Sequence, residues 1–276
     1  MYIGDYLGRR EIYSPDKLAI IDAGKSPELR LTYREFNARA KKLATWLRAT
    51  AGVDKGDRVA ILARDGVEHL DCFFACGKLG AIHTALNWRA HWRELVQLIE
   101  QTTPAVLIYS DDFKDNVQAI AQALQGTDHA ITHYLHIEGE GIRDGGHSLH
   151  YETTLQSSPA ETVTCPTLEK DDPACLLFTG GTTGLPKGAI ISHRMIAWNV
   201  LNTVIHDLAH DDTYLCVFPL FHAGGLFAYV SSQVVFGNTT ILTRQFDPAQ
   251  VLDLIARAQV TVFAGVPTLY PLMMQA

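Results

Sequence analysis

The segment Phe178–Gly188 reads F-T-G-G-T-T-G-L-P-K-G and combines three hydroxyl side chains and a glycine cluster with one lysine. Glycine lacks a Cβ and readily adopts positive φ, so backbone N–H groups can turn toward a ligand that approaches closely. The hydroxyls add hydrogen-bond donors, and the lysine adds a compact positive charge. A polyphosphate is the ligand that suits these groups. The candidate binding residues are Thr179, Gly180, Gly181, Thr182, Thr183, Gly184 and Lys187.

This run differs from the two most familiar nucleotide-binding loops. A Walker A loop has glycine directly before its lysine and a hydroxyl residue after it, whereas here Pro186 precedes Lys187 and Gly188 follows. The dinucleotide fingerprint G-x-G-x-x-G is also absent from the run. A Gly/Thr-rich stretch is by default an ordinary surface loop. The apolar residues 174–178 and 189–191 on either side instead predict strand–loop–strand at a sheet edge, where ligands often bind.

The composition predicts a globular chain of one large or two small domains. The chain has 276 residues, of which 47% are hydrophobic, and its mean hydropathy is +0.03. A formal net charge of −7 argues against nucleic acid as a partner, because binding the phosphate backbone requires a basic surface. The first ten residues contain no apolar signal region, and no apolar run is long enough to span a membrane. We therefore expect a cytoplasmic protein.

The cysteines and histidines show no recognised metal-binding spacing. The five cysteines lack C-x-x-C, and the twelve histidines lack H-E-x-x-H. Cys72 and Cys76 lie four residues apart in an apolar helical pattern, which would allow a metal pair, but no second pair of ligands is evident. Buried reduced thiols are the favoured interpretation, and no structural metal is predicted.

Strand and helix patterns alternate along the chain. Thr32 and Glu35 form a capping box before a helix with Phe36, Ala40 and Leu43 on one face. Strands are predicted at 59–62, 81–86, 105–109, 134–137, 174–178, 189–191, 214–218, 239–243 and 260–263, with helices between most of them. Such alternation is typical of α/β proteins whose parallel sheets are covered on both faces.

The composition also suggests a division of the chain. Residues 1–140 are predicted to form a first α/β unit, and residues 173–276 a second unit that carries the phosphate loop. Residues 141–172 are rich in Gly, Ser, Thr and Pro, so they are predicted to be a connecting surface segment. The last ten residues look like the first turns of a helix without a stop signal, which suggests a truncated chain.

The run Phe178–Gly188 resembles the phosphate loop of the acyl-adenylate-forming superfamily, [YF]-T-[SG]-G-[ST]-T-G-x-P-K-G. That superfamily includes acyl- and aryl-CoA ligases, luciferases of the firefly type and adenylation domains of peptide synthetases. Gly180 stands where many relatives carry serine, so one hydroxyl donor is missing. Phe218–Leu226 (F-P-L-F-H-A-G-G-L) resembles the substrate-pocket motif, and weaker similarities occur at 31–36, 78–95 and 265–268.

The resemblance implies two stacked, mostly parallel sheets with flanking helices, the truncated large N-terminal domain of an acyl-CoA synthetase-like enzyme. The superfamily's Y-G-x-T-E motif, ribose-binding aspartate, hinge, late catalytic lysine and small C-terminal domain are not found in the 276 residues. In the superfamily reaction, a carboxylate attacks the α-phosphorus of ATP, and CoA then displaces AMP from the acyl-AMP. ATP, Mg²⁺ and CoA are therefore the implied cofactors, with Thr182 near the Mg²⁺.

The resemblance also implies roles for individual residues. Lys187 would neutralise phosphate charge, and His222 would gate or orient groups between the adenylation site and the acyl or thiol channel. For a lone histidine at a strand end, a purely structural role is the ordinary interpretation, but the glycine pair after His222 would admit a ligand near the backbone. Trp198 and Asn199 could face the site, although their helical spacing favours packing.

Three functions remain open. The first is the N-terminal part of a CoA ligase for a fatty or aryl acid, inactive as this fragment; residues 218–230 contain no Asp or Glu that could hold an amino-acid substrate's ammonium group. The second is an adenylation domain that loads a carrier protein. The third is a non-catalytic half-protein that binds a nucleotide or an acyl group. The acid and the oligomeric state are not determined.

Overall fold

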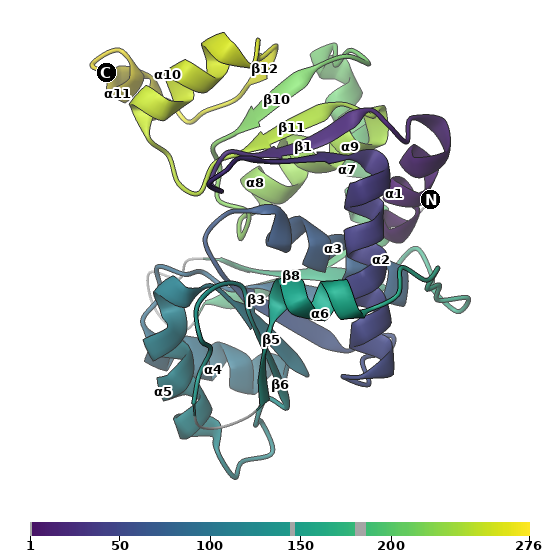
Figure 1. Cartoon of the computed structure of the whole chain (residues 1–276), viewed down its shortest axis with the longest axis vertical. Coiled ribbons are helices and arrows are strands. Elements are labelled where there is room, and N and C mark those ends of the chain that lie inside the picture. Colours follow the sequence, from purple (N-terminus) through teal and green to yellow (C-terminus); the bar gives the residue numbers. More distant parts are fainter. Residues whose placement is uncertain (1, 144–146, 180–185) are drawn as a thin grey trace. The chain divides into compact units, whose positions relative to one another are not determined.

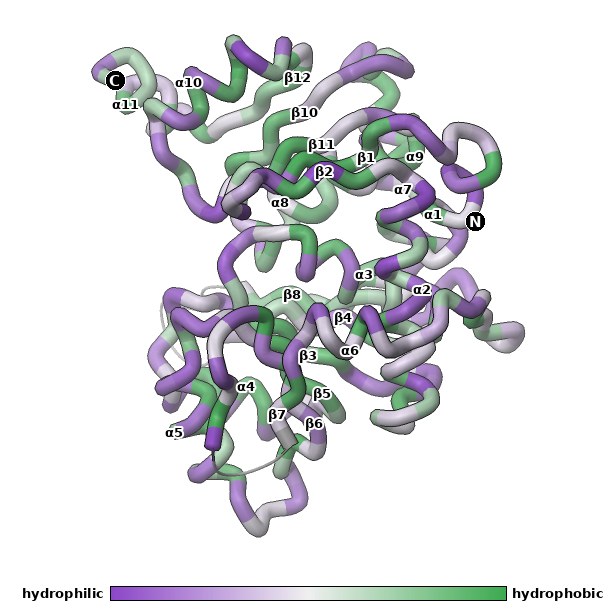
Figure 2. The backbone as a smooth tube through the Cα atoms, viewed as in Figure 1, coloured by the Kyte–Doolittle hydropathy of each residue, from purple (hydrophilic) through white to green (hydrophobic). Residues whose placement is uncertain are grey.

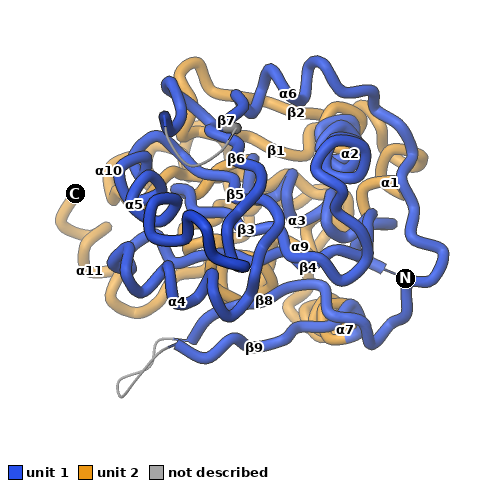
Figure 3. The backbone as a smooth tube through the Cα atoms, turned by 90° about the horizontal axis from the view of Figure 1, so that it is seen from below, with its two compact units in different colours: residues 1–5, 38–64, 68–194 blue, residues 6–37, 65–67, 195–276 orange. Residues whose placement is uncertain are grey.

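The computed structural model describes residues 2–143, 147–179 and 186–276 (Figure 1). The chain forms two compact units that are interleaved along the sequence (Figure 3). Unit 1 consists of residues 1–5, 38–64 and 68–194, and unit 2 of residues 6–37, 65–67 and 195–276. Each unit contains one mostly parallel sheet with helices, which confirms the predicted α/β class.

Unit 1 is built on a seven-stranded sheet of order β7-β6-β5-β3-β4-β8-β9. All neighbouring strands are parallel except β8 and β9, which form an antiparallel pair at one edge. The central strands β4 and β5 are buried along their whole length, as expected for strands covered on both faces. The strands are β3 Arg58–Leu62, β4 Ile82–Ala85, β5 Val106–Tyr109, β6 His133–His136, β7 His147–His150, β8 Pro173–Thr179 and β9 Lys187–Ser192.

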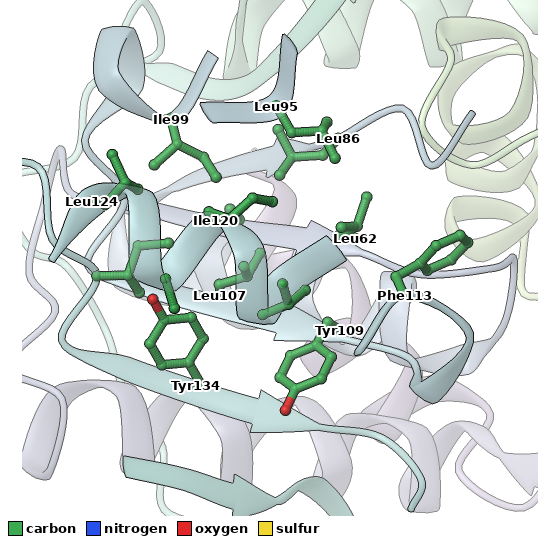
Figure 4. Close-up of a cluster of buried hydrophobic side chains, with 14 of the residues drawn as sticks. Leu62, Leu86, Leu95, Ile99, Leu107, Tyr109, Phe113, Ile120, Leu124 and Tyr134 are labelled. Carbon is green, nitrogen blue, oxygen red and sulfur yellow. The ribbon is translucent and has the colours of Figure 1, made fainter. Parts of the chain in front are cut away.

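Helices α4 and α5 supply a hydrophobic cluster that covers one part of this sheet (Figure 4). Leu95 of α4 and Ile120 of α5 belong to this cluster. They are joined there by Leu62, the last residue of β3, and by Leu107 of β5. The burial of Leu95 and Ile120 follows from the helical spacing of the apolar residues. The helices that precede β8 in the chain, of which most of α1 and the start of α2 belong to unit 2, are α1 Ile3–Tyr13, α2 Tyr33–Ala49, α3 Val67–Leu79, α4 Trp92–Thr102, η1 Asp111–Phe113, α5 Lys114–Leu124 and α6 Tyr151–Ser157.

Unit 2 contains a five-stranded sheet of order β12-β10-β11-β1-β2. β1 is parallel to β11, with Ile20 opposite Thr240, and antiparallel to β2. Strands β10 and β11 are coloured mostly hydrophobic in Figure 2, in line with their burial. The strands are β1 Leu18–Asp22, β2 Leu29–Thr32, β10 Thr213–Cys216, β11 Thr239–Leu242 and β12 Val262–Phe263.

The helical segments that follow β9 begin with α7. They are α7 His193–Thr203, η2 Val204–His206, α8 Ala223–Gly225, η3 Leu226–Val230, α9 Ser231–Phe236, α10 Pro248–Arg257 and α11 Leu269–Met273. At the predicted cap of α10, the Gln250 amide donates to Asp247 Oδ1 at 2.8 Å, and Pro248 occupies the first turn. Among the described residues, no helix is both long and apolar enough to cross a membrane.

The predicted capping box of α2 is confirmed. The Thr32 amide donates to Glu35 Oε2 at 2.8 Å, and the Glu35 amide donates to Thr32 Oγ1 at 3.3 Å. These two bonds satisfy N–H groups that the first helical turn leaves unpaired. On the predicted apolar face, Phe36, Ala40 and Leu43 are fully buried. The sequence signal and the packing of this helix therefore agree.

The units differ from the division expected at residues 140 and 173. Strands β8 and β9 belong to unit 1, because β8 pairs with β4 and places Leu176 opposite Thr84. The segment expected to be a surface connection contains β7, which pairs with β6, and α6, whose Tyr151 is fully buried. Both differences arise from pairing between strands that are distant in sequence, about which local composition carries no information.

A buried ion-pair network ties α2 to α3 and α6 within unit 1. Arg39 donates through Nε to Asp71 at 2.9 Å and through its two terminal nitrogens to Glu152 at 2.9 and 2.6 Å. The Tyr151 hydroxyl donates to the same Asp71 oxygen at 3.1 Å. Asp71 is fully buried, and this burial raises its pKa to about 7, although the Arg39 guanidinium opposes the shift. Asp71 therefore depends on Arg39 for its charge.

We expect Arg39→Met to lower the free energy of unfolding by about 3–5 kcal/mol, because the substitution leaves a buried carboxylate without its partner. Urea unfolding monitored by circular dichroism measures the change. Arg34→Met is the matched control on the same helix: Arg34 pairs with Asp16, and the two side chains are 56% and 82% exposed. An exposed pair contributes roughly 0–1 kcal/mol. Equal losses in both variants would contradict the role of Arg39.

The effect of Arg39→Met should grow with pH. A carboxyl whose pKa is raised on folding keeps its proton in the native state after the unfolded chain has released it, so its contribution to stability falls as pH rises toward the folded pKa. Arg39 lowers the pKa of Asp71, so in the variant this pKa lies above about 7. The pH range over which Asp71 reduces stability therefore extends to higher pH. We expect a larger loss of stability at pH 8 than at pH 5.5. A loss that does not change with pH would show that Asp71 does not titrate in this range.

Candidate functional site

The β8–β9 hairpin holds the two ends of the predicted phosphate loop. Thr179 ends β8 and lies opposite Lys187, which begins β9, and the Thr179 hydroxyl donates to the Lys187 carbonyl oxygen at 3.3 Å. Both residues are exposed at the edge of the sheet, as the sequence predicted for strand–loop–strand. The other predicted loop residues lie outside the described part of the chain: Gly180, Gly181, Thr182, Thr183 and Gly184.

The base of this hairpin is anchored in the core of unit 1. Phe178 is buried and belongs to the same hydrophobic cluster as Leu62 and Leu86. Residues opposite each other in an antiparallel pair have their side chains on the same face of the sheet, so Thr179 and Lys187 share one face. The arrangement places a hydroxyl and a cation next to each other at the two ends of a glycine-rich loop. Such a pair can bind an anion.

The Phe218–Leu226 motif lies at the carboxyl end of β10 in unit 2. Ligands of open α/β sheets bind at the carboxyl ends of parallel strands. The turn is held by the Leu220 amide, which donates to Asp65 Oδ1 at 2.7 Å, and by the His222 amide, which donates to the Pro219 carbonyl at 3.0 Å. Phe221 is buried, so this part of the motif is core.

His222 immediately precedes α8 and is exposed. Its carbonyl oxygen accepts hydrogen bonds from the Gly225 and Leu226 amides, both at 3.1 Å. Its ring lies 4.5 Å from that of Phe221, centroid to centroid, at an angle of 42°. The backbone of His222 thus starts the helical turn while its imidazole, beside a buried aromatic ring, stays accessible to solvent. Accessibility suits a residue that contacts a ligand.

Gly225 is required by a close backbone approach. A Cβ at this position would lie 2.2 Å from the Pro219 carbonyl oxygen, which no side chain can tolerate without movement of the backbone. A Cβ on Gly224 would have Phe218 Cγ as its nearest neighbour, at an ordinary 3.9 Å. Of the two glycines in the motif, only Gly225 is therefore sterically essential. It fixes the turn that carries His222.

The two residues of α7 behave differently from each other. The Asn199 amide donates to the Phe227 carbonyl oxygen, as expected for packing. Trp198 is 60% exposed, so the expectation that helical spacing packs it against the protein is wrong. Adjacent residues on a helix point in different directions, so Asn199 can face the protein while Trp198 faces solvent.

The fold brings a histidine next to the cysteine pair for which the sequence suggested no partner. The cysteines are free, and four of them are buried, as predicted. Cys72, Cys76 and His83 place one ligand atom each within 4.8 Å of one another. His83 lies on β4 and was not linked to the cysteines by its spacing. No local pattern could have indicated it, because the contact depends on how α3 packs on the sheet.

A family model described as AMP-binding enzyme matches residues 10–276. The chain belongs to the AMP-binding enzyme family. The chain is 34% identical over 270 residues to a feruloyl-CoA synthase from Amycolatopsis sp, covering 97% of this chain and 49% of that protein. It is 32% identical over 274 residues to an indoleacetate–CoA ligase from Aromatoleum aromaticum, covering 99% of this chain and 51% of the relative.

Solved structures agree with this assignment. The inhibitor-bound N-terminal domain of FACL13 from Mycobacterium tuberculosis matches the whole chain with a TM-score of 0.86 and 28% identity, and 65% of that structure is covered. The match confirms that this chain has the fold of an acyl-CoA synthetase-like N-terminal domain. The chain spans about half the length of the curated relatives it matches.

We expect Gly225→Ala to destabilise unit 2 by roughly 1–3 kcal/mol, because the added methyl group forces the Pro219 carbonyl to move. Thermal unfolding of the variant measures the loss. Gly224→Ala, one residue earlier in the same motif, should change stability by no more than about 0.5 kcal/mol. If the two variants unfold at the same temperature, the close approach at Gly225 is not what fixes this turn.

Proposed function

We propose that this chain is the N-terminal part of an ATP-dependent carboxylate–CoA ligase that activates an apolar acid as acyl-AMP. The observation that carries the proposal is the β8–β9 hairpin, which presents Thr179 and Lys187 at the two ends of the glycine-rich loop. Membership of the AMP-binding enzyme family and the similarity to two CoA ligases support it. Half the length of those relatives lies outside the similarity.

The proposed chemistry is displacement at phosphorus. A carboxylate oxygen of the acid forms a bond to the α-phosphorus of ATP, and the bond to the bridging oxygen of pyrophosphate breaks. Such a reaction depends on positioning and on neutralising charge rather than on covalent participation of the protein. In this proposal Lys187 and the Thr179 hydroxyl bind the leaving pyrophosphate, together with N–H groups of Gly180, Gly181 and Gly184 and the hydroxyl of Thr183.

Mg²⁺, when bound with ATP, supplies further positive charge that the phosphate oxygens need as charge develops. We assign Thr182 to the neighbourhood of this ion, on the resemblance alone. CoA is the proposed second substrate: its thiol displaces AMP from the acyl-AMP and gives the thioester.

The proposed acid is apolar, and an aryl acid is the better candidate. The motif that contains His222 has no carboxylate between residues 218 and 230, so it offers nothing to pair with a substrate's ammonium group. Feruloyl-CoA synthase and indoleacetate–CoA ligase, two relatives at more than 30% identity, are named for aryl acids. We assign His222, exposed beside the Phe221 ring, to orienting or gating the acid or the thiol.

An acid panel tests the proposed function. We expect a protein of the relatives' length that begins with this chain to release AMP when supplied with ATP, Mg²⁺, CoA and an aryl acid such as ferulate or indoleacetate. Palmitate reports on the fatty-acid version, and a phosphopantetheinylated carrier protein in place of CoA reports on the other thiol acceptor. The proposal fails if no aryl or fatty acid stimulates AMP release. The 276-residue chain alone should form little or no acyl-CoA.

The role of Lys187 is tested in the same assay. We expect Lys187→Ala to reduce kcat/KM for ATP by on the order of 10²-fold, because one positive charge at the developing phosphate charge is lost. Circular dichroism should show an unchanged fold, since the side chain is exposed. Lys170→Ala removes another exposed lysine of unit 1 and serves as the control. Unchanged ATP kinetics in Lys187→Ala would remove this residue from the site.

A further inference from the structure

A buried group of metal-ligating side chains lies in unit 1, away from the phosphate-loop hairpin in sequence. Cys72 and Cys76 are one helical turn apart on α3, and His83 lies on the following strand, β4. One ligand atom from each lies within 4.8 Å of the others, and His83 Nδ1 is 3.3 Å from Cys72 Sγ. All three residues are fully buried. Two sulfurs and an imidazole nitrogen thus converge on one point in the protein interior.

Cys175 brings a third thiol to the same region. It lies on β8 directly opposite His83 on β4, and residues opposite each other in a parallel pair have their side chains on the same face of the sheet. Cys175 is fully buried, and its pKa is raised first by this burial and then by the neighbouring Cys76 thiol. Cys175 therefore lies on the strand next to the group formed by Cys72, Cys76 and His83, but its sulfur is not among the ligand atoms that lie within 4.8 Å of one another.

Buried cysteines are ordinary small apolar core residues, whereas a buried imidazole brings two polar nitrogens into the interior. The Nε2 atom of His83 is buried and has no hydrogen-bond partner, an arrangement that costs free energy and is rare in proteins. An apolar residue of similar volume would avoid this cost. Neutral imidazole is the form that binds metal ions.

We propose that Cys72, Cys76 and His83, with Cys175 completing the set, bind one Zn²⁺ ion. Thiolate sulfur and imidazole nitrogen are the ligands of structural zinc sites, which are closed to water and four-coordinate. Ligand atoms around a tetrahedral Zn²⁺ lie roughly 3.5–3.8 Å apart, so the observed group needs only a small contraction to fit. The thiolates of Cys72 and Cys76 balance the charge of the ion, and the neutral imidazole adds none. A third thiolate at Cys175 leaves one net negative charge, far less than three unpaired thiolates would place in the interior.

The His69 ring can support this site. Its centroid is 6.4 Å from that of His83, and its Nε2 faces the Ala63 carbonyl oxygen at 3.2 Å. Because a carbonyl accepts only, this nitrogen carries the proton and leaves Nδ1 of His69 as an acceptor. Metal ligation through one nitrogen of His83 places the proton on the other, and ligating histidines normally donate that proton to a neighbour. His69 Nδ1 and His83 Nε2 each lack a hydrogen-bond partner in the structure, so this bond has to form when the ion binds.

Binding of Zn²⁺ would join α3 to β4 and β8. Each ligating thiol gives up its proton to solvent when its sulfur bonds to the ion, so at least two protons leave for each Zn²⁺ bound, and affinity falls as pH decreases. Because the ligands are buried, the ion must enter while the chain folds. The site does not depend on the proposed ligase activity, and its failure would leave that proposal intact.

The experiment is refolding of the 276-residue chain from guanidinium under reducing conditions, with equimolar Zn²⁺ or with a chelator, followed by dialysis and metal analysis. We expect about one Zn²⁺ per chain and a higher unfolding temperature in the zinc-refolded protein. The double variant Cys72→Ala/Cys76→Ala should retain no zinc, whereas Cys216→Ala, which removes a buried thiol of unit 2, should retain it in full. Zinc that persists in the double variant overturns the proposal.

Refolding with Co²⁺ keeps the test decisive even if the double variant does not fold. Cobalt in the same site should give the intense visible bands of tetrahedral coordination and a near-ultraviolet thiolate-to-metal band. Cys175→Ala, a milder change, should weaken the thiolate band by about a third if three sulfurs ligate. A wild-type protein that refolds fully but contains no zinc, and that shows no thiolate band with cobalt, has no such site.

Discussion

The parallel pairing of β8 with β4 is the constraint on which both sites of unit 1 depend. β4 and β8 are separated by three further strands, β5, β6 and β7, in chain order, yet they lie side by side in the sheet. The pairing buries the apolar residues of β8 against a sheet that is covered on both faces. It also fixes the register that puts Cys175 opposite His83. The strand that places Cys175 opposite His83 thus also ends at Thr179, the first residue of the predicted phosphate loop.

In each unit, the motif that contains the candidate binding residues follows the carboxyl end of a strand that has a parallel neighbour. β8 leads to the phosphate loop, and β10 leads to the turn with His222. Each motif is adjoined by buried groups. Phe178, which precedes the loop, belongs to the core cluster of unit 1, and Gly225 of the His222 turn packs closely against the Pro219 carbonyl. A stable base lets the exposed residues keep a defined position, which is the requirement for catalysis by positioning.

Local features of this fold could be predicted from the sequence, and long-range ones could not. The capping box at Thr32, the cap at Asp247 and most strands were predictable, because each depends on residues a few positions apart. The interleaved units were not, since β1 joins β11 through a pairing that leaves no trace in local composition. The phosphate loop was recognised from its residue types, whereas the partners of Cys72 emerged only from the packing of a helix on a sheet.

The interleaving of the units has a consequence for synthesis on the ribosome. Residues 38–64 and 68–194 of unit 1 are complete before most of unit 2 has been translated, whereas β1 must wait for β11, which follows it by some 220 residues (Ile20 pairs with Thr240). At about 5–20 residues per second, the interval is on the order of 10–40 seconds. During that time the apolar β1–β2 hairpin lacks its sheet. Until β11 has been translated, the edge of β1 that pairs with it in the folded protein has no partner strand.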